Sequence, residues 1–88
     1  MLDWTVYIIE SSRGTLYTGI TTCLSRRLAE HARGRRGARF FRTAAPRDIV
    51  YVEVAADRGA ALRREAEIKS YGRARKLSLI AALRQGAP

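Results

Sequence analysis

The 88-residue sequence is poor in cysteine, proline and acidic residues, and it has no long hydrophobic run. Its single cysteine, Cys23, cannot form an internal disulfide or a cysteine metal cluster, which predicts a reducing compartment. No apolar run approaches the ~20 residues of a membrane span, and residues 1–3 lack the pattern of a signal peptide. We therefore expect a single cytoplasmic domain over residues 1–88 with no membrane segment.

The scarcity of acidic residues leaves a strong positive charge. Eight Asp and Glu stand against 17 Lys and Arg, so the net charge is +9. The excess is concentrated in residues 23–47 and 58–88, and arginine outnumbers lysine. Guanidinium groups bind phosphate through paired hydrogen bonds. The composition therefore favours nucleic acid as a partner over an arginine-rich surface with no binding role.

Three segments have the composition of β-strands. Residues 4–10 and 16–20 are rich in β-branched and aromatic side chains and flank a turn with Gly14, so they are expected to pair antiparallel. Residues 48–55 alternate valine with other side chains and predict a third strand. Helices are expected at about residues 22–34, 57–71 and 73–84. In the last helix the expected core residues are Leu77, Ile80 and Leu83, or Leu79 and Leu83.

The first expected helix and the strand before it should bring polar side chains together. The residues of this helix expected to face a core are Leu24, Leu28 and Ala32. Arg27 and His31 fall with Cys23 on a neighbouring stripe. Gly19 lets the backbone approach another group closely, and Tyr17 shares its face of the strand. We expect Tyr17, Arg27 and His31 to converge at the junction of strand and helix.

The register of the hairpin decides whether Tyr7 joins this group. A loop with an odd number of residues, such as one that pairs Glu10 with Gly14, places Tyr7 opposite Tyr17. A four-residue loop places the two tyrosines on opposite faces. Three-residue loops that end in a left-handed glycine are common, yet the sequence alone does not choose between these loops. A site with two tyrosines requires the odd loop.

Residues 34–47 form a long connection for so small a domain. They contain five arginines around Phe40 and Phe41. Arginine on phosphate and a ring under a base would suit a strand of nucleic acid. An equally weighted alternative is that the two phenylalanine rings close the edge of the core and that the arginines are only solvated. The candidate nucleic-acid-binding residues of the chain are Arg26, Arg35, Arg36, Arg39, Arg42 and Lys69.

Glu65 is the most informative residue of the second expected helix. The other residues of its predicted inward stripe are Ala61, Leu62, Ile68 and Lys69, whereas Glu67 should point to solvent. A carboxylate on a packing face costs several kcal/mol unless it is paired or bound to metal. We interpret Glu65 as a metal ligand or catalytic group, with a salt bridge to one of the arginines as the alternative.

Taken in order, these motifs resemble the GIY-YIG nuclease domain in its short stand-alone bacterial form. Val6-Tyr7-Ile8 stands in place of the first motif, and Tyr17-Thr18-Gly19 follows about ten residues later as the second. Arg27 and His31 follow at the family's spacing. The stand-alone branch is indicated by Gly37-Ala38-Arg39, by Pro46 before Val-Tyr-Val-Glu, and by Ala61-Leu62-Arg63-Arg64-Glu65 with Ile68-Lys69 downstream. The departures are Val6 and Ile8 in the first motif, and Phe40-Phe41 in place of a more polar pair.

The resemblance implies an α+β fold, a three-stranded antiparallel sheet flanked by three helices. It implies a divalent-metal-dependent endonuclease in which Glu65 holds Mg²⁺ or Mn²⁺ and Arg27 binds the scissile phosphate. Tyr7 and Tyr17 would activate and orient the attacking water, with Tyr7 favoured as the base, and His31 matches a position that is less often indispensable.

The expected partner is DNA rather than RNA. We expect the enzyme to cut single-stranded or branched DNA, or DNA with weak selectivity, and to act in DNA repair or recombination. The protein is expected to be a monomer or weak dimer without an organic cofactor. The first alternative is a non-catalytic nucleic-acid-binding module that retains the nuclease fold. The second is an interaction protein whose charge is incidental.

Overall fold

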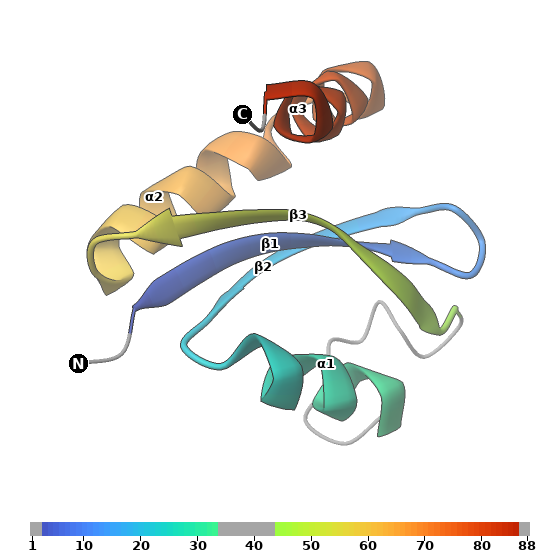
Figure 1. Cartoon of the computed structure of the whole chain (residues 1–88), viewed down its shortest axis with the longest axis horizontal. Coiled ribbons are helices and arrows are strands. Elements are labelled where there is room, and N and C mark those ends of the chain that lie inside the picture. The colour runs from blue at the N-terminus through green and yellow to red at the C-terminus, as the bar shows by residue number, and fades with distance from the viewer. Residues whose placement is uncertain (1–2, 34–43, 87–88) are drawn as a thin grey trace.

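The computed structural model describes residues 3–33 and 44–86 and contains three strands and three helices in these ranges (Figure 1). In chain order they are β1 (Trp4–Ser11), β2 (Leu16–Thr21), α1 (Leu24–Arg33), β3 (Pro46–Ala55), α2 (Arg58–Lys69) and α3 (Arg73–Gly86). All six expected elements are present. No boundary differs from its expected position by more than two residues; β3 begins at Pro46, two residues early, because that residue pairs with Ser11 of β1.

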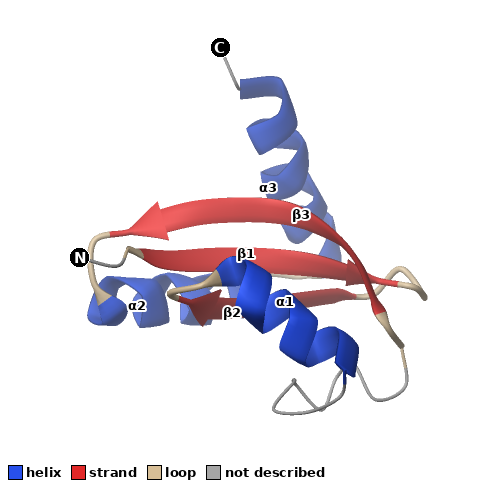
Figure 2. Ribbon diagram, turned by 60° about the horizontal axis from the view of Figure 1, so that its bottom comes forward, coloured by secondary structure: helices blue, strands red, loops and turns tan. Residues whose placement is uncertain are grey.

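The strands form an antiparallel sheet in the order β2-β1-β3, so β2 is one of its edges. Helix α1 covers one face of the sheet, and α2 and α3 lie on the other (Figures 1 and 2). This arrangement confirms the expected α+β fold. Among residues 3–33 and 44–86 there is no helix with the length and hydrophobicity of a membrane span.

The hairpin between β1 and β2 has the odd loop that a two-tyrosine site requires. Glu10 pairs with Leu16, which leaves five residues between them, and Gly14 has a φ of 81°. The Ser11 hydroxyl oxygen accepts hydrogen bonds from the backbone N–H groups of Arg13 and Thr15 and holds this longer turn. The suggested pairing of Glu10 with Gly14 was therefore wrong.

This register places the two tyrosines on one face as diagonal neighbours rather than directly opposite each other. Tyr7 pairs with Gly19, and Tyr17 pairs with Ile9. Because residues two apart on a strand share a face, both phenol rings lie on the face covered by α1.

Each face of the sheet buries its own cluster. The buried cluster on the side of α2 and α3 consists of Val6, Ile8, Tyr51, Ala55, Ala61, Ile68 and Ile80. On the side of α1, Tyr7 and Ile9 are fully buried, and Tyr17, Leu24 and Leu28 pack against them. The second cluster is smaller and richer in aromatic side chains.

Three predictions of helix orientation were wrong in part. On α1, Ala32 is exposed and His31 is buried in its place, because the polar stripe of this helix faces the tyrosines. On α2, Leu62 and Lys69 are exposed, which leaves Ala61, Glu65 and Ile68 on the inner side. On α3, Ile80 is buried and Leu79 is half-buried, whereas Leu77 and Leu83 are exposed, since only one narrow stripe of this helix packs on the sheet.

Candidate active site

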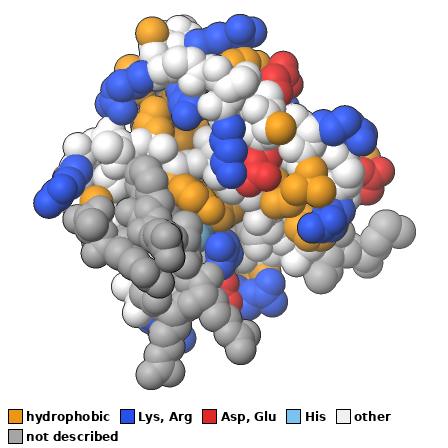
Figure 3. Space-filling view, turned by 180° about the vertical axis from the view of Figure 1, so that it is seen from behind, with side chains coloured by type: hydrophobic (Ala, Val, Ile, Leu, Met, Phe, Trp, Pro, Cys, Tyr) orange, Lys and Arg blue, Asp and Glu red, His pale blue; other side chains and the backbone are white. Residues whose placement is uncertain are grey.

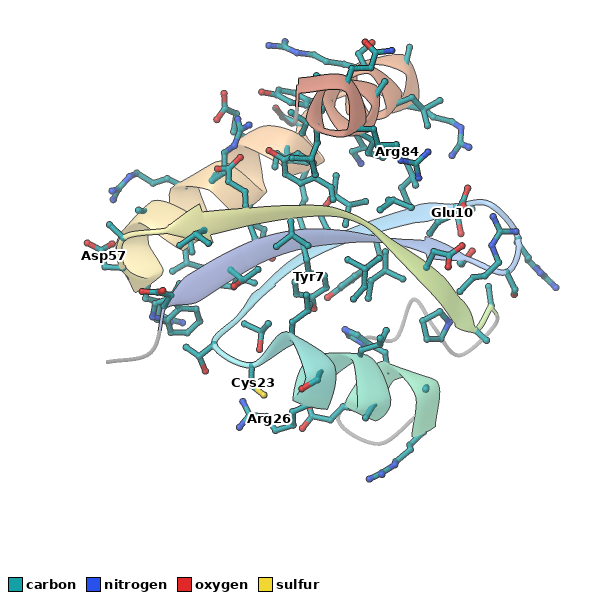
Figure 4. The ribbon with its side chains drawn as sticks, viewed as in Figure 1. Tyr7, Glu10, Cys23, Arg26, Asp57 and Arg84 are labelled. Atoms are coloured by element: carbon teal, nitrogen blue, oxygen red, sulfur yellow. The ribbon has the colours of Figure 1, made fainter. Side chains whose placement is uncertain are left out.

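Tyr7 lies at the centre of the candidate site. Its side chain is fully buried and points from the middle of β1 toward α1 (Figure 4). A Cβ atom at Gly19, the cross-strand neighbour, would stand 2.6 Å from the Tyr7 hydroxyl and 3.1 Å from Cε2 of Tyr17. Glycine at this position therefore leaves the space that the Tyr7 phenol fills, because any larger residue would displace the ring.

His31 is the hydrogen-bond partner of Tyr7. Its Nε2 atom lies 3.0 Å from the Tyr7 hydroxyl, and the residue is only 1% exposed. Burial lowers the pKa of His31 to about 4, and the positive charge of Arg27 adds to this effect, whereas Glu30 opposes it. The imidazole is therefore neutral at pH 7.

The Tyr7 phenol keeps its proton at the same pH. Its pKa is raised to about 12, mainly by burial and also by the nearby Tyr17 and Glu65. A hydrogen bond from Arg27 and the charge of that residue act in the opposite direction. In the tautomer of the neutral imidazole that carries its proton on Nδ1, the Tyr7 O–H donates to Nε2 of His31. In that tautomer the hydrogen bond is a path for a proton from phenol to imidazole.

Tyr17 and Arg27 complete the group on this face. The Tyr17 ring lies 5.3 Å from the His31 ring, edge to face, and 6.3 Å from the Tyr7 ring, measured between centroids. The Arg27 side chain is 26% exposed, and its Nη1 atom lies 3.2 Å from Oε1 of Glu30. Partial burial opposes the charge of Arg27, but hydrogen bonds with Glu30 and Tyr7 outweigh it and raise the pKa. Arg27 is therefore a permanent cation that can reach both the phenol and solvent.

Glu65 approaches the site from the other side of the sheet. Helix α2, which carries it, lies on the face opposite to α1 (Figure 1) and packs against β2. The resemblance implies that Glu65 and Arg27 serve one reaction. Their helices cover opposite faces of the sheet, yet both side chains act on the Tyr7 phenol. The Glu65 side chain is 18% exposed, and its Oε2 atom lies 3.2 Å from Nζ of Lys69. Its negative charge nevertheless acts on the Tyr7 phenol, which places the carboxylate within electrostatic range of that group.

The residues at this site fit a magnesium-like cation better than a transition metal. In the part of the chain that the structure describes, no group of three or more His, Cys, Asp or Glu side chains could hold a metal. Mg²⁺ needs only one or two protein carboxylates, because water and phosphate oxygens fill its other positions. Glu65 is a partly exposed carboxylate whose ion-pair partner, Lys69, is a flexible surface side chain. It could hold such a cation together with a phosphate.

The other predicted binding residues do not belong to the group around Tyr7. Arg26 is exposed and lies on the side of α1 away from the sheet (Figure 4), and Lys69 is exposed and paired with Glu65. Four candidates lie outside the described residues: Arg35, Arg36, Arg39 and Arg42. The two phenylalanines of the long connection, Phe40 and Phe41, lie outside them as well. The structure therefore brings together Tyr7, Tyr17, Arg27 and His31.

Sequence reasoning missed Glu30, which orients Arg27 and counteracts the effect of its charge on His31. The signal was available, because Arg27 and Glu30 are three residues apart on one helix and such pairs face each other. Elsewhere the surface is mainly basic. Figure 3 shows Lys and Arg side chains spread over the rear face of the molecule, with acidic side chains in only a few places.

The chain is similar to known proteins in three comparisons. A family model described as the GIY-YIG catalytic domain matches residues 3–78. A UPF0213 protein of Desulfotalea psychrophila is 45% identical over 83 residues, which cover 94% of this chain and 76% of that protein. A UPF0213 protein of Haloquadratum walsbyi is 49% identical over 74 residues, 84% of this chain and 82% of that protein.

A solved structure is also similar. The solution NMR structure of the UPF0213 protein BH0048 from Bacillus halodurans matches with a TM-score of 0.58 and 35% sequence identity. The match covers 91% of this chain and 84% of that chain. The similarity in sequence and in structure therefore extends over nearly all of the fold described above.

Proposed function

This chain belongs to the GIY-YIG catalytic domain family, and from that premise we propose that it is an endonuclease that hydrolyses phosphodiester bonds in DNA with a divalent metal. The observation that carries the proposal is the grouping of Tyr7, Tyr17, Arg27 and His31 on one face of the sheet. Glu65, whose charge lies within electrostatic range of Tyr7, adds the carboxylate that would hold the metal in such a reaction. The net charge of +9 supports a polyanionic substrate.

Each side chain has a role that follows from its surroundings. Arg27 binds the scissile phosphate and neutralises the charge that develops on it, because it is a cation beside the phenol and partly open to solvent. Tyr17, half-buried beside His31, orients the attacking water. A divalent cation bound by Glu65 would stabilise the leaving oxygen as a Lewis acid.

Tyr7 acts as a proton relay in this proposal, because with a pKa near 12 it is not ionised at neutral pH. Its oxygen takes a proton from the attacking water while its own proton moves along the existing hydrogen bond to Nε2 of His31. The water oxygen forms the new bond to phosphorus, the bond to the leaving oxygen breaks, and His31 ends as the cation. No free phenolate is needed at any point.

The first test is cleavage of matched single-stranded, duplex and forked DNA, beside RNA of the same sequence, with Mg²⁺ or Mn²⁺. We expect DNA cleavage that requires the metal and falls about 10²–10³-fold in Arg27→Ala, the usual loss when a group that stabilises the transition state is removed. Arg33→Ala, an exposed arginine on the same helix, is the matched control and should cleave normally. Cleavage that survives Arg27→Ala would refute the mechanism.

The second test concerns Glu65. Glu65→Gln should weaken Mn²⁺ binding, measured by water proton relaxation with DNA present, and should abolish cleavage. Glu67→Gln is the control, because Glu67 lies on the same helix but is exposed and paired with Arg64. Unchanged Mn²⁺ binding in Glu65→Gln would contradict the assignment. Salt-sensitive binding with no cleavage of any substrate would instead support the non-catalytic module.

A further inference from the structure

A second basic site lies at the hairpin end of the sheet, outside the candidate active site. A pocket of about 180 Å³ is lined by Thr15 from the hairpin loop, by Leu16 at the start of β2, and by Arg73 and Lys76 from the first turn of α3. One water molecule needs only ~10–15 Å³ of such space, so the pocket has room for a larger hydrated group. Two cations and a hydroxyl line it, and no acidic side chain does.

The two cations of this pocket have no acidic partner among the described residues. Six of the eight acidic side chains of the protein form ion pairs with other Lys and Arg residues: Glu10, Glu30, Asp48, Glu53, Glu65 and Glu67. Glu10 is the cross-strand neighbour of Leu16, which lines the pocket, but its carboxylate pairs with Arg47 and not with a cation of the pocket. Figure 4 shows Glu10 at the same end of the sheet. The positive charge of the pocket is therefore uncompensated.

The pocket and the candidate active site are joined by β2. Leu16 faces the side of α3, and the next residue, Tyr17, faces the side of α1. Gly19 lies three positions after Leu16, which is about 10 Å along a strand. Since β2 is an edge of the sheet, its outer side pairs with no other described strand (Figure 2). A polyanion that runs along this edge would reach both places.

We infer that Thr15, Arg73 and Lys76 bind a backbone phosphate of the nucleic-acid substrate, a few nucleotides from the bond that is cut. A guanidinium, an ammonium and a hydroxyl together supply the donors that a phosphodiester accepts. The inference rests on the proposed function for its substrate class, but it concerns binding and not the chemical step.

Binding is measured without divalent metal, so that cleavage plays no part. The fluorescence anisotropy of a labelled 12-nucleotide single strand is followed for the wild type and for R73A/K76A at several salt concentrations. We expect about tenfold weaker binding for the variant at low salt. The slope of log K against log salt should be smaller by about 0.7 for each phosphate that the variant no longer neutralises.

The control is R58A/R63A, which removes the same charge from exposed positions of α2 and should weaken binding less than threefold. R73K/K76R keeps both charges and should bind nearly as the wild type does. Equal losses in R73A/K76A and R58A/R63A would overturn the inference, because the effect would then be one of net charge. The amide fingerprint of each variant by NMR verifies that it is folded.

Titration with inorganic phosphate and with RNA separates the possible ligands. Phosphate should shift the amide signals of Thr15, Leu16, Arg73 and Lys76 more than that of Arg63. Shifts with phosphate but no binding of either nucleic acid would overturn the assignment to a nucleic-acid backbone. If no substrate is cleaved and R73A/K76A still binds DNA more weakly than R58A/R63A, the phosphate-binding role of the pocket is supported and the nuclease proposal fails. Normal binding by R73A/K76A in a protein that cleaves DNA refutes the pocket alone.

Discussion

The two faces of the sheet bury different kinds of side chain. Under α2 and α3 the cluster is mainly aliphatic, with Ile8 and Ile68 fully enclosed. Under α1 the enclosed residues include a phenol and an imidazole that are joined by a hydrogen bond, Tyr7 and His31. Aliphatic burial favours folding without directional requirements, whereas a buried polar pair is favourable only when each group has its partner. The first face therefore stabilises the fold, whereas the second positions the polar groups of the candidate site, whose burial is unfavourable if either group loses its partner.

The largest effect should come from the aliphatic face. Ile8→Ala removes a fully buried side chain and should lower the free energy of unfolding by about 2–5 kcal/mol, measured by urea denaturation. Val54→Ala is the matched control, because Val54 is 66% exposed and should change stability by less than about 0.5 kcal/mol. Similar losses in the two variants would mean that this face does not dominate stability.

The polar face should be sensitive to acid. The pKa of His31 is about 4 in the folded protein and about 6.5 when unfolded, so the unfolded state binds more protons between these values. This contribution is complete above pH 6.5 and is lost as the pH falls to 4, at a cost of up to about 3 kcal/mol. Urea denaturation at pH 7, 5.5 and 4 should show a smaller loss for His31→Gln than for the wild type. Parallel curves would contradict the buried neutral imidazole.

Gly19→Ala should test how tightly the polar face is packed. The added methyl group would meet the Tyr7 hydroxyl at 2.6 Å, and the ring is buried, so the hydrogen bond to His31 must be disturbed. We expect a loss of about 1–3 kcal/mol in urea denaturation and a higher pKa for His31 by NMR titration. Gly72→Ala is the control, because a Cβ atom there meets nothing within 4 Å. Equal effects would show that the space beside Tyr7 is not limiting.

The smallest effect should come from the start of α2. The Asp57 side chain caps this helix and accepts a hydrogen bond of 2.8 Å from the backbone N–H of Ala60. Asp57→Ala should cost about 1 kcal/mol in urea denaturation, whereas Asp57→Asn should retain most of the stability. The His31 titration should be the same in both variants, because α1 and α2 cover opposite faces. A shifted titration would reveal coupling between the faces.

Local patterns were sufficient to predict the elements and most of the site. Alternating valines marked β3, and the spacing of Tyr17, Arg27 and His31 predicted their convergence. The hairpin register could not be predicted, because it depends on hydrogen bonds of the Ser11 hydroxyl within a five-residue loop. Periodicity also indicated which side of α2 faces inward, but not which face of the sheet this helix covers. That choice depends on the path of the whole chain.

The pocket beside α3 was missed for a related reason. Arg73 and Lys76 look in the sequence like ordinary solvated charges on a helix, and only the folded chain brings them beside Thr15. Their separation from Thr15 along the chain is too large for a local pattern to report. Long-range placement of this kind becomes visible only in three dimensions.

The placement of α1 and α2 on opposite faces also matters while the protein is being made. A nascent chain that has left the ribosome only as far as α1 already contains Tyr7, Tyr17, Arg27 and His31, but it lacks Glu65. The acid arrives with α2, after β3 has completed the sheet on which that helix packs. In our proposal, the metal-binding carboxylate is therefore the last part of the site to be synthesised.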